Sequence, residues 1–156
     1  MDFKELIDEF AKQYGIEDYT IENGELTLVV DYTAVTIREA TNAKALIVSA
    51  VVGGAMPDSK GHFASLLLQA NHLFAGAHAV TICQHPDTDE YLAIRTIPHA
   101  LADVEALADT ISILANVVDE WRANRTAFLD IDREANQEDE EAAELNPLFG
   151  GYFIRV

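Results

Sequence analysis

Five histidines and one cysteine are the side chains of this chain best suited to hold a metal ion. They are His62, His72, His78, His85, His99 and Cys83. No two histidines are four residues apart, as a metal pair on one helix face would be, and no second cysteine completes a zinc motif. Cys83 and His85 would share one face of a strand, but two ligands do not make a site. The sequence favours Cys83 as a small buried residue, His85 and His99 as turn residues beside prolines, and no metal or other cofactor.

Motifs of nucleotide binding and nucleophilic catalysis are missing. Gly53-Gly54 is not followed by the lysine and the Ser or Thr of a phosphate-binding loop, and the chain holds no G-x-S-x-G or G-x-G-x-x-G. Carboxylate pairs do acid–base chemistry only in a pocket that shifts their pKa, which a sequence does not reveal. The sequence predicts no catalytic residue and favours a binding protein over an enzyme.

The charge of the chain excludes several kinds of partner. It has 27 Asp and Glu against 10 Lys and Arg, a net charge of −17, which opposes the phosphate neutralisation that nucleic-acid binding needs. Its longest apolar run, residues 45–56, is far short of the ~20 residues of a membrane span. No basic and apolar leader opens the sequence, and one cysteine forms no internal disulfide. We expect a cytoplasmic protein with no nucleic-acid partner and no membrane insertion.

Apolar spacing predicts three helices in a domain over residues 1–129. The first has an apolar face and Gly15 as its C-cap. The second begins near Pro57-Asp58-Ser59 and ends near Gly76, and the third is a long helix capped by Asp103. Their apolar stripes are, in order, Phe3, Leu6, Ile7, Phe10 and Tyr14; Phe63, Leu66, Leu67, Ala70 and Phe74; and Val104, Leu107, Ile111, Leu114, Val118 and Trp121.

Strand patterns fill the segments between these helices. Residues 19–37 are rich in β-formers around Asn23-Gly24, the strongest short hairpin motif. Residues 46–52 form a near-continuous apolar run, as in a central strand, and residues 79–84 and 91–97 form a second hairpin. The predicted fold class is α+β, with three helices packed on a twisted, mostly antiparallel sheet.

The chain continues beyond this domain in two unlike pieces. Residues 130–144 hold eight acids and one arginine, too little apolar surface to offset the ordering entropy, so they are expected to be a solvated linker. Residues 145–156 are an apolar peptide, whose predicted self-docking side chains are Leu148, Phe149, Tyr152, Phe153 and Ile154. Either this peptide docks on an apolar surface, where it would mimic a client strand, or it is a disordered tail.

Three short stretches resemble one known family. They are Leu66-Leu67-Leu68-Gln69-Ala70-Asn71 followed by Leu73-Phe74; Val51-Val52-Gly53 with Met56-Pro57; and Tyr91-Leu92 to Ile97-Pro98, leading into the Asp103 helix and Glu120-Trp121-Arg122. In this order they resemble the class I chaperones of type III secretion, the CesT/SycE-like (Tir chaperone) family, over residues 2–128. The extension departs from that pattern, because family members generally stop near the end of the last helix.

The resemblance implies a homodimer that binds a non-globular segment of a secreted effector and keeps it soluble and competent for export. The client is expected to contact the first helix at Phe3, Leu6, Ile7 and Phe10, unless these side chains only seal the domain's own core. The second helix is apolar over more than the ~100° that one-sided burial requires, which predicts a dimer interface at Leu66, Leu68, Leu73 and Phe74. The alternative is an interaction or regulatory domain of the same fold without a secretion client.

Overall fold

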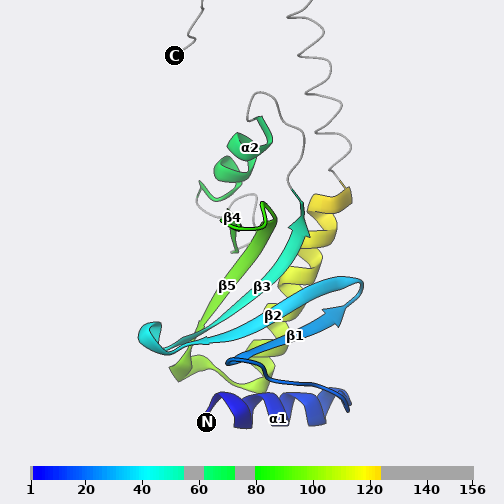
Figure 1. Cartoon of the computed structure of the whole chain (residues 1–156), viewed down its shortest axis with the longest axis vertical. Helices are drawn as coiled ribbons and strands as arrows, with labels where there is room; N and C mark the ends of the chain where they lie inside the picture. Colours follow the sequence, from blue (N-terminus) through cyan, green and yellow to red (C-terminus); the bar gives the residue numbers. More distant parts are fainter. Residues whose placement is uncertain (1, 55–61, 73–79, 124–156) are drawn as a thin grey trace, which may run out of the picture.

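The computed structural model describes residues 2–54, 62–72 and 80–123, which form helices packed on one sheet (Figure 1). In chain order the elements are helix α1 (Phe3–Tyr14), strands β1 (Glu25–Val30), β2 (Thr33–Ala40) and β3 (Ala45–Gly53), helix α2 (His62–Ala70), and strands β4 (Thr81–Gln84) and β5 (Tyr91–Pro98). Two short 3-10 turns are η1 (Thr41–Ala43) and η3 (His99–Leu101). Residues 104–123 are helical and are called the long helix below.

The strands form a five-stranded antiparallel sheet in the order β1-β2-β3-β5-β4. β3 lies in the middle, as its apolar run predicts, and β1 and β4 are the two edges. The predicted second hairpin is β4 with β5. The predicted fold class, α+β with three helices on a mostly antiparallel sheet, is confirmed.

The core lies on one face of this sheet. The register sets Ile37 opposite Val48 and Val35 opposite Ala50, and all four are at most 1% exposed. The long helix runs behind the sheet in Figure 1 and packs on this face. Its buried side chains in the same core are Leu107, Ile111, Leu114, Val117, Val118 and Trp121. Each large apolar side chain buried in this way stabilises the fold by about 1.5–3 kcal/mol.

Helix α1 begins and ends where its capping residues dictate. The Asp2 carboxylate accepts from the Glu5 N–H at 2.8 Å, and the Glu5 carboxylate accepts from the Asp2 N–H at 3.0 Å, which forms a capping box. At the other end Gly15 has a φ of 67°, the left-handed conformation that glycine adopts without strain. The predicted C-cap is therefore confirmed, as is the Asp103 cap of the long helix, whose carboxylate accepts from the Ala106 N–H at 2.8 Å.

Helix α2 lies beside β4 at the opposite end of the molecule from α1 (Figure 1). Leu67 is 4% exposed and Leu68 71% exposed, so this helix turns one side to the core and leaves an apolar side chain outside it. The predicted start at Pro57-Asp58-Ser59 and the predicted end near Gly76 lie outside the described residues.

The first hairpin turns at a different place from the one that the sequence predicts. Asn23 and Gly24 do form a turn with positive φ, but it closes a single bridge between Glu22 and Glu25. The long hairpin of β1 and β2 turns instead at Asp31 and Tyr32, which also have positive φ. The motif identified a real turn, whereas the pairing of alternating apolar residues decided where the long strands meet.

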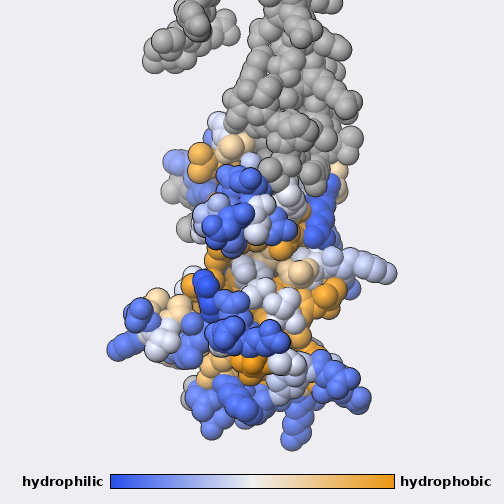
Figure 2. Space-filling model, in the orientation of Figure 1, coloured by the Kyte–Doolittle hydropathy of each residue, from blue (hydrophilic) through white to orange (hydrophobic). Residues whose placement is uncertain are grey.

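Hydropathy divides the surface seen in Figure 2. Hydrophobic side chains gather over the middle of the molecule, around the sheet, while hydrophilic side chains cover α1 at its lower end. No helix within residues 2–54, 62–72 and 80–123 is long and apolar enough to cross a membrane.

Candidate functional site

A groove lies between the C-terminal half of α1, the free edge of β1 and the long helix. It has a volume of about 720 Å³. Its apolar lining comes from all three elements and from the loop after α1: Phe10, Tyr14, Ile16, Leu28, Val29, Val30, Ala108, Ile111 and Ala115. Asp18 and Asp31 are its two charged lining residues. The groove therefore suits an apolar ligand more than a charged one, and favours a positive charge over a negative one at its rim.

The strand that borders this groove offers unpaired backbone groups. In a hairpin with a two-residue turn the pair next to the turn, here Val30 and Thr33, is hydrogen bonded, and bonding alternates from there. Leu28 and Val30 thus direct their N–H and C=O groups to β2, whereas Thr27 and Val29 direct theirs into the groove side. Within the described residues these outward groups of Thr27 and Val29 have no hydrogen-bond partner.

The free edge of β1 begins after Glu25, whose outward backbone groups are already hydrogen bonded to Glu22. The Glu25 N–H donates to the Glu22 carbonyl, and the Glu22 N–H donates to the Glu25 carbonyl, each at 2.9 Å. The unpaired stretch of β1 therefore covers the residues that line the groove, and Val29 within it is 75% exposed. An exposed β-branched residue on an open edge is the kind of site to which another strand adds.

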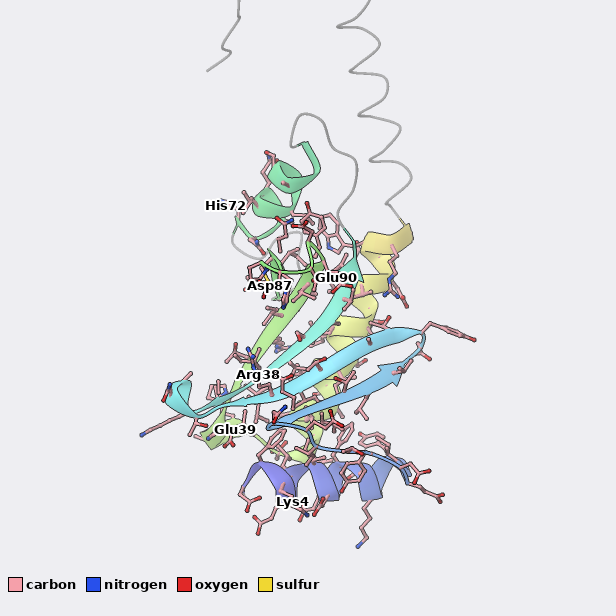
Figure 3. All side chains as sticks on the ribbon, in the orientation of Figure 1. Lys4, Arg38, Glu39, His72, Asp87 and Glu90 are labelled. Atoms are coloured by element: carbon pink, nitrogen blue, oxygen red, sulfur yellow. The ribbon has the colours of Figure 1, made fainter. Side chains whose placement is uncertain are left out.

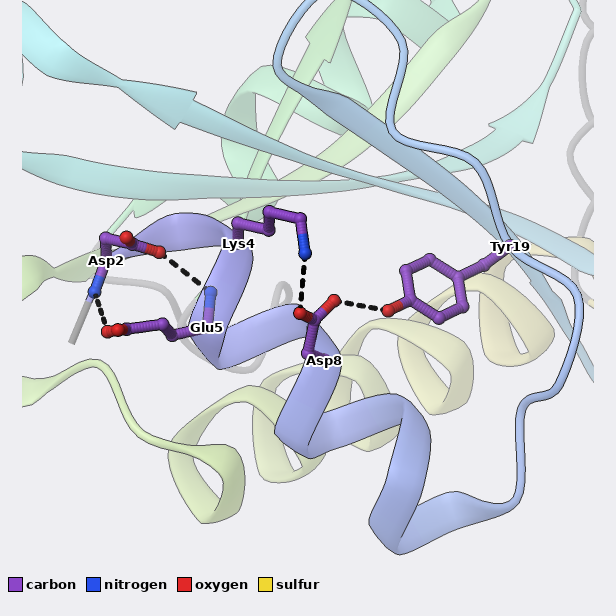
Figure 4. Close-up of polar contacts among 5 residues, drawn as sticks. All are labelled: Asp2, Lys4, Glu5, Asp8 and Tyr19. Carbon is purple, nitrogen blue, oxygen red and sulfur yellow. Dashed lines mark hydrogen bonds and ion pairs between the residues drawn. The ribbon is translucent and has the colours of Figure 1, made fainter.

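Polar contacts hold the loop that forms one wall of the groove (Figure 4). The Lys4 ammonium lies 2.7 Å from the Asp8 carboxylate, and the Tyr19 hydroxyl donates a short hydrogen bond to the same carboxylate. The hydrogen bond from Lys4, and to a smaller extent the one from Tyr19, lowers the pKa of Asp8 below its usual value. The same bond to Asp8 raises the pKa of Tyr19. Asp8 thereby ties residues 16–19 to the outer side of α1.

The opposite edge of the sheet is closed by a side chain. The Asn71 amide donates to the Ile82 carbonyl at 2.9 Å, and its oxygen accepts from the Ile82 N–H at 2.8 Å. Asn71 thus satisfies both backbone groups of Ile82, which face away from β5, as a neighbouring strand would. The Ala70-Asn71 pair that carries part of the family resemblance therefore has a physical role at this edge.

Arg122 joins the long helix to the end of β3. Its guanidinium donates to the carbonyls of Val51 and Val52 at 2.9 and 3.4 Å, and to the buried Thr33 hydroxyl at 2.9 Å. The register of β3 with β5 shifts between Val51 and Gly53. Arg122 therefore supplies the hydrogen bonds that this irregularity removes from the strand ladder.

Titratable side chains do not converge on one place in the described part of the chain. Figure 3 shows Lys4 on α1, Arg38 and Glu39 on β2, His72 after α2, and Asp87 and Glu90 in the turn between β4 and β5. No group of three or more His, Cys, Asp or Glu side chains that would hold a metal occurs among the described residues. Cys83 is half-buried, and burial raises the pKa of its thiol.

The predicted client-contact residues of α1 lie at the lower part of the core. Leu6, Ile7 and Phe10 are at most 5% exposed and pack in this chain's own core, and Phe3 is half-buried against it. Of these four, Phe10 also lines the groove, where its ring lies 4.8 Å from that of Tyr14. Client contact at these residues stays a prediction.

The predicted dimer and tail residues are described only in part. Leu68 is exposed on α2, while Leu66 belongs to that helix without a described side chain. Leu73 and Phe74 lie outside the described residues, as do all five predicted docking residues of the tail and the boundaries at 129, 130 and 144.

Most of the groove was not predicted as a site from the sequence. Tyr14, Leu28 and Ile111 were assigned to the apolar faces of separate elements, and nothing local shows that these faces leave a gap between them. The sequence signal that could have pointed to the groove is the alternation of Leu26, Leu28 and Val30, which leaves Val29 on the outer face.

Comparison with known proteins identifies the family and the fold of this chain. The family model of the Tir chaperone protein (CesT) family matches residues 5–122. No curated protein matches the chain. Among solved structures, a chain of the HopA1–SchA chaperone–effector complex has 18% identity and a TM-score of 0.66, over 78% of this chain and 93% of that one.

Two further structures share the fold. The Yersinia pestis structure of the type III secretion chaperone SycH with a fragment of YscM2 gives 20% identity and a TM-score of 0.57, over 77% of this chain and 97% of that one. YbjN from E. coli gives 13% identity and a TM-score of 0.61, over 82% and 94%. Because the family model covers most of the chain, including β1, Asn71 and Arg122, this protein belongs to the Tir chaperone protein (CesT) family.

Proposed function

We propose that this protein is a type III secretion chaperone that binds an extended segment of an effector at the β1 edge. Membership of the Tir chaperone family supports this function, and so does a fold shared with chains of chaperone–effector complexes. The observation that carries it is a pair of backbone positions, Thr27 and Val29, that have no partner among the described residues and lie beside an apolar groove. The protein would act without catalysis and in the cytoplasm.

The geometry defines what the client segment must look like. A strand laid along β1 would accept from and donate to the backbone of Thr27 and Val29, which gives affinity without sequence selection. Every second side chain of that strand would point between β1 and the long helix, towards Leu28 and Ile111. The preferred client is therefore a non-globular stretch with alternating apolar residues and, because of Asp18 and Asp31, without acids at the groove rim.

We further propose that the chaperone is a homodimer whose contact includes α2. Leu68 is 71% exposed on that helix, which lies beside β4, at the edge of the sheet opposite β1. A dimer formed there would keep the two client grooves open. The charge of −17 would keep the chaperone itself soluble while its clients are apolar.

A proline at the β1 edge tests the proposed site. Val29→Pro removes an N–H that points away from β2, so it costs the sheet no ladder bond but blocks an added strand. Val29→Thr is the matched control, because it keeps the N–H and the β-branched shape. The tagged full chain is isolated from its native host in wild-type, Pro and Thr forms, and co-purified proteins are quantified by mass spectrometry.

A secreted protein should accompany the wild type and Val29→Thr, and its amount should fall at least about tenfold with Val29→Pro. Circular dichroism and thermal unfolding check that the proline variant is folded. Equal recovery of that protein with folded Val29→Pro would contradict the proposed site.

A second function has one observation in its favour. YbjN, a candidate transcription regulator, has the same fold, so the fold also serves proteins of other roles. The same isolation separates the two: a partner that is never exported would favour an interaction or regulatory domain without a secretion client.

A further inference from the structure

This chain extends well beyond the part that it shares with its relatives. The family match ends at residue 122, and 77–78% of this chain covers 93–97% of the chaperone-complex chains. The surplus contains the acidic residues 130–144 and then the apolar residues 145–156. A feature added to the common fold needs an explanation that the common fold does not give.

The end of this extension has the pattern of a short strand. Tyr152, Ile154 and Val156 would lie on one face of an extended segment, with Phe153 and Arg155 on the other. These residues are aromatic or β-branched apart from the arginine, which is the composition that favours strands. Gly150-Gly151 precedes the segment and allows the chain to turn into it.

The β1 groove offers such a strand hydrogen-bonding partners and an apolar surface. In the described part of the chain Thr27 and Val29 present N–H and C=O groups without partners, and the lining between β1 and the long helix is apolar. On the outer face Val29 is 75% exposed, where an aromatic side chain of an added strand would cover it. With Tyr152 and Ile154 in the groove, alternation sets Phe153 on the side of Val29.

Charge favours this occupant over the rest of the extension. Among the described residues the groove is lined by Asp18 and Asp31 and by no Lys or Arg. Residues 130–144 hold eight acids and would be repelled, whereas Arg155 is the only Lys, Arg, Asp or Glu in residues 145–156. The last segment is therefore the part of the extension whose charge complements the groove.

The groove is also within reach. Asn116 lines it and lies two turns before residue 123, a distance of about 10 Å at the ~1.5 Å rise of a helix. A random coil from 124 to 151 would have a root-mean-square span of about 30 Å. That span is enough to return to a groove on the same domain.

We propose that residues 152–156 add to the free edge of β1 in the same chain and occupy the groove when no client is present. The docking itself needs only the groove and the peptide. Its consequence, that a client must displace the peptide, rests on the proposed function. The device would shield an apolar open edge from aggregation until a client arrives.

Amide hydrogen exchange in the full-length protein tests the docking. The residue-resolved exchange of Thr27 and Val29 is measured by NMR in three forms: wild type, Tyr152→Asp with Ile154→Asp, and Ala142→Asp with Ala143→Asp. The third form is the matched control, because it adds the same two charges to the extension outside the docking segment.

The Tyr152/Ile154 variant should exchange these two amides at least about tenfold faster than the wild type, and the control should not. A synthetic peptide of residues 146–156 added to that variant should slow the exchange again. Equal exchange in all three forms would overturn the proposal. Protection in the wild type that falls on dilution from 100 to about 1 µM would overturn docking within one chain in favour of exchange between copies.

No client is present in this measurement, so its outcome is independent of the client test. Loss of client binding in Val29→Pro with unchanged exchange in the tail variant would retain the chaperone function and remove the docking. Peptide docking without any secreted client would retain the docking and remove the chaperone function.

Discussion

The two edges of the sheet are finished in opposite ways. At β4 the Asn71 side chain bonds both outward backbone groups of Ile82. At β1 the outward groups of Thr27 and Val29 face a groove instead. Both edges border apolar surface, so the difference is not in hydrophobicity but in whether the backbone is already paired.

This difference assigns separate tasks to the two ends of the molecule. An open edge is an aggregation hazard, and proteins keep one where it is used. In the proposed scheme, the Asn71 contact at β4 assigns strand addition to β1, and α2 with β4 would provide the packing between copies. The predictions below test that division, beginning with the change that should cost most.

The two faces of α2 should respond differently to a charge. Leu67→Asp places a carboxylate in the core, where Leu67 is 4% exposed, and should lower the free energy of unfolding by at least about 3 kcal/mol. Leu68→Asp changes a side chain that is 71% exposed and should cost under about 0.5 kcal/mol. Urea denaturation measures both.

Leu68→Asp should nevertheless separate the proposed dimer. Light scattering of the wild type at micromolar concentration should give twice the 17.2 kDa chain mass, and the variant should give the single-chain mass. A wild type that scatters as one chain, or a Leu68→Asp variant that stays dimeric, contradicts this contact.

Removing the side chain that closes β4 should cost less than a core charge. Asn71→Ala leaves the N–H and C=O of the buried Ile82 without their partner, and we expect a loss of about 2 kcal/mol in the free energy of unfolding. Gln69→Ala, two residues earlier in α2, is the control, since it removes only an exposed contact with Ser65. If both variants lose the same small amount, Asn71 does not hold this edge.

The smallest effect concerns the loop beside the open edge. Because the folded pKa of Asp8 is lowered, its contacts with Lys4 and Tyr19 stabilise the protein above pH ~4 and lose that effect as pH falls through the folded pKa. The raised pKa of Tyr19 has the opposite sign: its contribution is complete below pH 10 and is lost as pH rises further. The contact is therefore intact between these limits.

Thermal unfolding of the Tyr19→Phe variant and of the wild type measures how much the Tyr19–Asp8 contact contributes to stability. The difference in melting temperature should be constant from pH 5 to 9 and should shrink progressively as pH falls below about 4. Tyr14→Phe, at a ring that packs against Phe10, is the control. A difference for Tyr19→Phe that does not change with acid would show that Asp8 is not its partner in solution.

The sequence was sufficient for the elements because their patterns are local. The α1 stripe with Gly15, the central run of β3 and the Asp103 cap each depend on residues within a few positions, and all three are confirmed. The predicted turn of the β1–β2 hairpin was wrong because this turn depends on strand pairing as well as on local residues. Asn23-Gly24 is a strong turn motif, whereas Asp31-Tyr32 is a weak one that the pairing of β1 with β2 imposes.

The site was harder to predict because it depends on distant residues. The groove exists where Tyr14, Leu28 and Ile111 fail to meet, and no spacing along the chain records a gap. The role of Asn71 could not be predicted either, since its side chain bonds the backbone of Ile82, eleven residues away. The family resemblance pointed to this asparagine without giving its physical reason.

The Arg122 anchor has a consequence for how strongly a client must bind. By fixing the end of the long helix to β3, it gives the extension a constant starting point. A tether of this kind holds its peptide at an effective concentration of about 1 mM. A peptide with a dissociation constant of about 0.1 mM would then fill about 90% of the grooves and weaken the apparent affinity of a client about tenfold. In the proposed docking, such a tether would set a threshold that only the tighter-binding clients pass.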